Sequence, residues 1–221
     1  MIFDYELELE GIPETTRDLI FERDGYACWL CGDTSHLNIA HQIHASAFRH
    51  PFPLFKENGT ISIPDLSHSD NLFPLCPSCH TSYDLAFPNW IMVPDADTLR
   101  KYLEHEEEDY NYRQKSLESL PRTLPSIDRT KVLYHPAILS TQFQVHMSKV
   151  KPVSRWRKHW LGEPTTVIHR AAWHGLLDSN PIQQIRSGRR TFQRGVPPVF
   201  QSLIGDLVRL WARAAPRGTR L

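Results

Sequence analysis

The sequence predicts an α+β fold in which a small core with four cysteines is followed by a basic C-terminal region. Three observations in the 221-residue chain lead to this prediction. Short apolar segments of strand length lie between segments of helical spacing. All four cysteines occur in two Cys-x-x-Cys pairs, Cys28/Cys31 and Cys76/Cys79. The charge is also divided, because residues 1–120 carry 21 acidic and 8 basic side chains whereas residues 121–221 carry 4 and 17.

Length and composition exclude several classes of protein. A chain of 221 residues can bury a real core in one or two domains. No apolar run approaches the roughly 20 residues that span a bilayer. Residues 1–10 are acidic where an export signal would be basic. We therefore expect an intracellular protein, cytoplasmic or nuclear, with no transmembrane segment and no membrane partner. The sequence does not indicate an oligomeric state.

The first 125 residues carry clear strand and helix signals. Three segments have the composition of short strands: residues 37–43, 72–75 and 89–93. Three others have the spacing or end signals of helices: residues 13–24, the segment after Pro77, and residues 98–119. The acidic run 104–109 in the last of these is expected to be a solvated face. Residues 44–70 contain several prolines and turn formers and are expected to be irregular.

The chain changes character after Pro121, where proline, arginine and tryptophan become frequent and apolar periodicity weakens. We therefore divide the chain into residues 1–125 and a basic, partly irregular region, 126–221. The sequence defines no fold for this region beyond an amphipathic helix at 199–215. Its basic charge suits a polyanion such as nucleic acid, unless the two charged ends merely neutralise each other. The residues expected to contact nucleic acid are Arg155, Arg157, Lys158, Arg189 and Arg190, with Trp156 and Trp160 either stacking on bases or packing.

The two cysteine pairs predict a structural zinc site. Thiolates bind zinc well because it is a borderline-soft ion, and two Cys-x-x-Cys turns supply four sulfur ligands. The 44 residues between Cys31 and Cys76 exceed the spacing of about 15–20 in a zinc ribbon, which an inserted module would explain. A thioredoxin-like redox pair is the alternative. Two pairs and the lack of a βαβ pattern argue against it.

Four segments stand in order around these cysteines: Arg23-Asp24-Gly25, Ile39-Ala40-His41, Asp70-Asn71-Leu72 and Leu75-Cys76-x-x-Cys79-His80. As an ordered set they resemble the HNH endonuclease family, in particular the HNH domains of fungal proteins, over residues 14–95. The resemblance implies a ββα-metal core, which is a β-hairpin followed by a helix, braced by the cysteine site and flanked by helices. It also implies an enzyme: a metal-dependent endonuclease that hydrolyses phosphodiester bonds, with DNA as its partner.

The resemblance assigns a role to each site residue. His41 would be the general base, since an imidazole with a pKa near 6.5 accepts a proton at neutral pH. Asn71 would hold the loop and orient this base. His80 would bind a divalent cation, Mg²⁺ or another ion, that contacts the scissile phosphate. Asp84, one helical turn later, would be a second ligand of this ion.

One position departs from the family pattern. Many members carry an acid or a histidine immediately before the base as a metal ligand, whereas this chain has Ala40, which cannot coordinate. Three alternatives follow. His80 and Asp84 hold the ion with water and phosphate, another group such as His44 helps, or the nuclease is impaired. An impaired nuclease would be a zinc-braced module for nucleic-acid binding or protein interaction, and a purely structural zinc protein is a further alternative.

Overall fold

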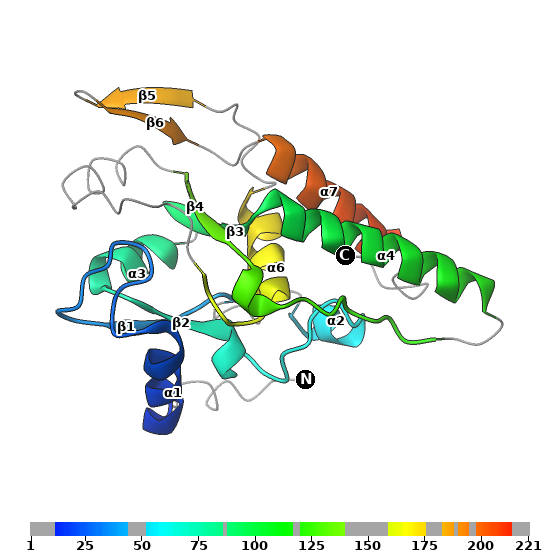
Figure 1. Ribbon diagram of the computed structural model, residues 1–221, viewed down its shortest axis with the longest axis horizontal. Coiled ribbons are helices and arrows are strands. Elements are labelled where there is room, and N and C mark those ends of the chain that lie inside the picture. The colour runs from blue at the N-terminus through cyan, green and yellow to red at the C-terminus, as the bar shows by residue number, and fades with distance from the viewer. Residues whose placement is uncertain are drawn as a thin grey trace, which may run out of the picture.

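The computed structural model describes residues 12–43, 52–85, 88–116, 120–139, 159–175, 183–187, 190–194 and 198–213. The chain is mixed α+β (Figure 1). Its elements in order are α1 (Glu14–Asp24), β1 (Asn38–His41), α2 (Phe52–Glu57), the 3-10 turn η3 (Ser69–Asn71), β2 (Leu72–Leu75), α3 (Pro77–Tyr83), β3 (Trp90–Pro94), α4 (Ala96–Lys115), the 3-10 turn η4 (Arg129–Lys131), β4 (Tyr134–Ile138), α6 (Pro164–Gly175), β5 (Gln183–Ser187), β6 (Arg190–Arg194) and α7 (Pro198–Arg213). None of the helices in these ranges has the length and apolarity needed to span a membrane.

Each strand of the described ranges pairs with one antiparallel partner. The pairs are β1–β2, β3–β4 and β5–β6. In the first pair Asn38 lies opposite Leu75 and His41 opposite Leu72. The helix α3 begins two residues after β2, with Pro77 at the first helical position, where a missing N–H costs nothing. The strand β1, its partner β2 and the helix α3 therefore form a strand–strand–helix unit. His41 lies at the end of β1, and His80 lies in α3.

The strand β3 separates two apolar cores. Its side chains alternate between them, as the period of two along a strand requires. Trp90 and Met92 belong to the cysteine-side core, whose other buried members are Cys28, Trp29, Leu30, Ala40, Phe73, Leu75, Cys76, Cys79, Tyr83, Val132, Tyr134, Ile138, Trp160 and Val167. Ile91 and Val93 belong to the helix-side core, whose other buried members are Leu99, Tyr102, Ala137, Leu139, Ile168, Ala171, Ile204, Leu207 and Trp211.

The two cores lie toward different ends of the molecule. Figure 1 shows α1, β1, β2 and α3 grouped at one end, and α4 and α7 running alongside each other at the other. The helix α6 contributes to both cores, through Val167 on one side and Ile168 on the other. Together, β3 and α6 form the shared centre of the fold.

The first helix ends where its glycine signal predicts. Gly25 has φ +86°, in the left-handed region that favours glycine, and its N–H donates to the Phe21 carbonyl at 2.8 Å. Ile20 is the buried side chain of this helix, and it packs against Ile39 and Leu72. Ile20 and Arg23, which donates to the Leu72 carbonyl, therefore fix α1 against the β1–β2 pair.

The division at residue 125 does not coincide with a boundary between cores. β4 pairs with β3, and Tyr134, Trp160 and Val167 are buried beside the cysteines. Trp160 is thus a packing residue and does not stack on bases. Its indole lies so close to Gly162 that a Cβ there would be 2.1 Å from a ring carbon, so this position needs glycine. The predicted helix at 199–215 corresponds to α7.

The acidic run 104–109 is not the wholly solvated face that its composition suggests. Glu106 and Asp109 are buried. The guanidinium of Arg122 lies 2.8 Å from the Glu106 carboxylate, and Arg113 lies 2.6 Å from that of Asp109. Arg113 is four residues after Asp109 on the same helix, a spacing at which such pairs form, whereas Arg122 lies after α4 and sequence spacing gave no sign of its pairing with Glu106. The acids between them, Glu107 and Glu108, are exposed.

Candidate functional site

The structure brings the four cysteines together. Their sulfur atoms all lie within 4.8 Å of one another, and Cys31 Sγ is 3.7 Å from Cys76 Sγ. A tetrahedral ion with Zn–S bonds of about 2.3 Å requires sulfur separations of about 3.8 Å. The cysteines are all free thiols rather than disulfides. The donor set and its spacing therefore fit a zinc ion, as the sequence predicts.

Backbone hydrogen bonds shape both halves of this cluster. In the first half, the Gly32 N–H donates to the Cys28 carbonyl at 2.8 Å, with Gly32 at φ +78°. In the second half, Cys76 is the N-cap of α3, and the His80 N–H donates to its carbonyl at 2.9 Å. The Trp29 N–H joins the halves by donating to the Pro74 carbonyl on β2 at 2.9 Å. A cation bound here would tie the loop between α1 and β1 to the start of α3.

The thiols influence one another strongly. A hydrogen bond from Cys31 lowers the pKa of Cys28 to about 2, and the same contact raises the pKa of Cys31 to about 12. Hydrogen bonding to Cys28 also raises the pKa of Cys79. Without a cation the cluster thus favours one thiolate that is stabilised by neighbouring S–H groups. A divalent cation would be needed to stabilise further thiolates in so small a volume.

Beside the cysteines, His80 and Asp84 form a pair on α3. His80 Nε2 lies 2.7 Å from Asp84 Oδ2, and the two side chains are 24% and 21% exposed. The spacing of four residues places both on one face of the helix. Adjacent ligands of an octahedral ion with bonds of about 2.1 Å are about 3 Å apart. The 2.7 Å contact is itself that of a hydrogen bond between the imidazole and the carboxylate. To share one divalent cation, His80 would carry its proton on Nδ1, and both groups would turn their lone pairs toward the ion.

His41 is the last residue of β1 and is partly exposed. The strand register sets it opposite Leu72, the residue that follows Asn71. The preceding residue, Ala40, is buried opposite Phe73. In the described part of the chain, the cysteines are the only group of three or more His, Cys, Asp or Glu side chains that could hold a metal ion. No third side chain of these types therefore joins His80 and Asp84 among the described residues.

Asn71 fastens the chain just after His41. Its side-chain carbonyl accepts from the Ile43 N–H at 2.9 Å, and its amide donates to the carbonyls of Ile43 and Leu66 at 2.9 and 2.7 Å. Its backbone carbonyl accepts from the Gln42 N–H at 2.7 Å. Because Asn71 is completely buried, its side chain acts on the loop and does not reach a substrate.

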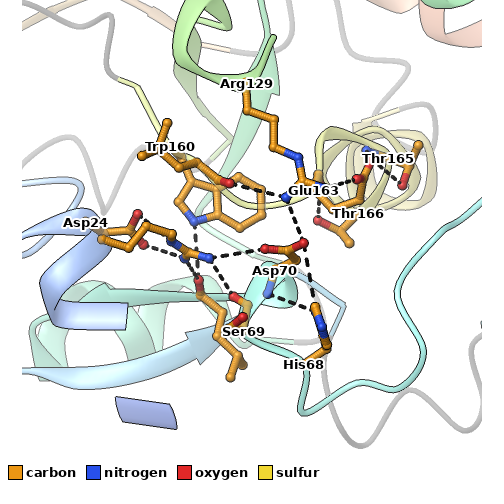
Figure 2. Close-up of polar contacts among 12 residues, drawn as sticks. Asp24, His68, Ser69, Asp70, Arg129, Trp160, Glu163, Thr165 and Thr166 are labelled. Carbon is orange, nitrogen blue, oxygen red and sulfur yellow. Dashed lines mark hydrogen bonds and ion pairs between the residues drawn. The ribbon is translucent and has the colours of Figure 1, made fainter. Parts of the chain in front are cut away.

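A charged network holds the turn that carries Asn71. Figure 2 shows Arg129 between Asp70 and Glu163, with 2.7 Å separations to both carboxylates. From α1, Arg23 donates to the Ser69 and Leu72 carbonyls at 2.9 and 2.6 Å. Sequence reasoning did not find Arg129 or Glu163, because their partner lies 59 and 93 positions away along the chain. Arg23 and Asp70, both in the family-like segments, were the available signs of this network.

Several predicted residues cannot be placed against this site. Arg155, Arg157, Lys158, Arg189, His44 and Trp156 lie outside the described residues. Arg190 is the first residue of β6, where the backbone alone is described. In the sequence, residues 183–194 contain four arginines and no acid. The backbone of β5 and β6 forms an antiparallel ribbon in which Arg186 is opposite Thr191.

Comparison of the chain with protein-family models, with curated proteins and with solved structures found no match.

Proposed function

We propose that this protein is a metal-dependent endonuclease of the HNH type that hydrolyses DNA phosphodiester bonds. The observation that carries the proposal is the order and pairing of three elements. A strand ending in His41 pairs with a strand that begins after Asn71, and a helix with His80 and Asp84 follows at once. The cysteine cluster joins the loop before the first strand to the start of the helix. This arrangement corresponds to the hairpin and helix of a ββα-metal core.

In this proposal His41 is the general base. Its ring nitrogen takes the proton of a water molecule whose oxygen attacks the phosphorus, and the bond from phosphorus to the 3′ oxygen breaks. Asn71 keeps the residues after His41 in place. His80 and Asp84 would hold a divalent cation such as Mg²⁺. When bound, such a cation stabilises the negative charge that develops on the phosphate and the leaving oxygen. The cysteines would bind zinc and take no part in the reaction.

A second candidate function is a zinc-braced nucleic-acid-binding module without catalysis. The observation that favours it is Ala40, since the pair on α3 lacks a third protein ligand within the described residues. Binding would then depend on the basic C-terminal region, including the arginine-rich segment 183–194. Such binding weakens steeply as the salt concentration rises, because it releases counterions from the phosphates.

The test is nicking of supercoiled plasmid by the zinc-loaded protein with Mg²⁺ or Mn²⁺. We expect His41→Ala to lower the rate about 10²- to 10⁴-fold, the usual contribution of a general base. Zinc content and thermal stability should not change. His36→Ala is the matched control, because His36 is exposed on the loop before β1. Equal rates for wild type and His41→Ala would refute the catalytic assignment. Salt-sensitive binding with no nicking in either divalent ion would support the second candidate.

A further inference from the structure

A buried arginine from α6 touches both elements of the candidate site. Arg170 is 5% exposed. Its Nη1 donates to the Gln42 carbonyl at 2.9 Å, and its Nη2 donates to the Tyr83 carbonyl. Gln42 directly follows His41, and Tyr83 directly precedes Asp84. One planar guanidinium therefore spans the end of β1 and the end of α3.

Further contacts close this connection into a network. The Arg170 guanidinium lies over the Tyr83 ring, 3.6 Å from its centroid. The Tyr83 hydroxyl donates to the Gln42 side-chain carbonyl, and the Gln42 amide lies 3.3 Å from Met92 Sδ. Gln42 and Tyr83 are completely buried. A buried polar network of this kind holds one arrangement, because any other leaves polar groups without partners.

The charge of Arg170 has a different kind of partner from that of Arg122, whose side chain is also buried. Arg122 pairs with the Glu106 carboxylate. For Arg170, no carboxylate of the described residues lies within ion-pair distance, and two backbone carbonyls take its place. Keeping a charge buried in this way costs free energy that an apolar side chain of similar size would not. The contacts that Arg170 makes in return all lie at the ends of β1 and α3.

The helix α6, which carries Arg170, is also fixed to the turn that contains Asp70 and Asn71. The Glu163 N–H, just before α6, donates to the Asp70 carbonyl at 2.9 Å. Arg129 bridges the carboxylates of the same two residues, as Figure 2 shows. Asp70 precedes Asn71, so the start of α6 is tied to the turn that holds the loop after His41. The residue before α6 and the middle of α6 therefore contact the neighbours of Asn71, His41 and Asp84.

We propose that Arg170 is a positioning residue, which fixes His41 relative to His80 and Asp84. This inference rests on the proposed nuclease function for its catalytic consequence. It assigns to α6, in the basic C-terminal region, a direct part in assembling the site. Arg170 itself does not touch the reacting atoms: its two Nη groups donate to backbone carbonyls, and its buried Nε has no hydrogen-bond partner among the described residues.

The experiment compares zinc-loaded wild type, Arg170→Ala, Arg170→Lys and the control Arg122→Ala in plasmid nicking. Small displacements of a reacting group can cost about 100-fold in rate, so we expect a kcat loss of that order for Arg170→Ala. The KM for DNA and the zinc content should be unchanged. The kcat of Arg170→Lys should lie between those of wild type and Arg170→Ala. An ammonium group keeps the charge but lacks the planar, forked arrangement of donors of a guanidinium. Arg122→Ala should lower the melting temperature and leave kcat unchanged when assayed below it.

A second readout does not need activity: the NMR signals of the His41 and His80 rings. We expect Arg170→Ala to shift both signals and Arg122→Ala to shift neither. If wild type nicks plasmid and both Arg170 variants nick it at the wild-type rate, the positioning role of Arg170 is wrong, and the nuclease assignment is unaffected. If wild type does not nick plasmid but the His41 and His80 ring signals shift in Arg170→Ala, the nuclease assignment is wrong, and the positioning role of Arg170 is supported. If wild type does not nick and the signals do not move, both are wrong. Should Arg170→Ala fail to fold, Arg170→Lys decides by the same criteria.

Discussion

The two cores on either side of β3 are stabilised by different means. The cysteine-side core has four sulfur ligands at its centre, surrounded by aromatic rings such as Trp29 and Trp90, which stack with centroids 6.2 Å apart. The helix-side core has aliphatic side chains and Trp211 between α4, α6 and α7, and it is flanked by buried ion pairs from Glu106 and Asp109. The sulfur ligands lie entirely on the first side.

This difference has a physical reason. The strands β1 and β2 have four residues each, and α3 has seven, so these elements bury little apolar area. Elements this short need a further constraint, which a metal can provide. The helices α4 and α7 have 20 and 16 residues and stabilise each other by packing along their length. We therefore expect the cysteine side to depend on metal and the helix side to depend on packing and charge.

The largest expected effect is that of removing the metal. Structural zinc contributes about 10–16 kcal/mol in small zinc domains, which exceeds the whole stability of many proteins. Cys79→Ser should therefore abolish zinc binding and hydrogen-exchange protection in β1, β2 and α3. The amides of α4 and α7 should keep more of their protection. Ser78→Ala is the control, as Ser78 is exposed in the same turn. Equal loss of protection on both sides would mean that the two cores unfold as one unit.

The next largest effect is expected on the helix side. Glu106→Ala leaves the buried Arg122 without its counter-charge, and breaking such a pair costs about 3–5 kcal/mol. Burial raises the pKa of Glu106, so its charge is itself costly, and Glu106→Gln should be milder than Glu106→Ala. The matched control is Asp97→Asn on the same helix. Asp97 is 84% exposed in its pair with Arg100 and should contribute less than about 1 kcal/mol. Urea unfolding of the three variants measures the difference, and equal losses would contradict a special role for the buried pair.

A smaller effect is expected on the free energy of unfolding when the pH is lowered, and it depends on His169. His169 is stacked between the rings of Phe55 and Trp211, with centroid distances of 3.8 and 4.3 Å, and its Nε2 lies 3.0 Å from the Thr60 carbonyl. Burial lowers its pKa from 6.5 to about 3. Between these values the unfolded chain binds a proton that the folded chain does not, so stability falls as the pH falls from 6.5 towards 3.

From pH 7 to pH 5 this residue alone should remove about 2 kcal/mol from the free energy of unfolding. His169→Gln keeps an amide donor near the position of Nε2 but does not titrate. Urea unfolding at the two pH values should therefore show a loss smaller by about 2 kcal/mol in the variant than in wild type. An equal loss in both proteins would show that His169 is not held neutral.

Local patterns predicted much of the fold near the site. Gly25 ends α1 because glycine alone accepts its backbone conformation readily, and Pro77 begins α3 because its fixed φ suits a first helical turn. The Cys-x-x-Cys spacing predicted a cluster, which the sulfur distances bear out. The helix at α4 was also expected, although Glu106 on it was misjudged as solvated. Burial of a charge depends on its partner, and that partner was in another segment.

By itself, the sequence determined the short-range features: element types, turns and the reduced cysteine pairs. Those depend on residues within a few positions of each other, and spacing along the chain reveals them. Tertiary structure alone decided the pairing of β4 with β3, the burial of Trp160 and the connection of Arg170 to both Gln42 and Tyr83. The partners of Arg170 are 128 and 87 positions away, and a contact over that distance leaves no periodic signal in a single sequence.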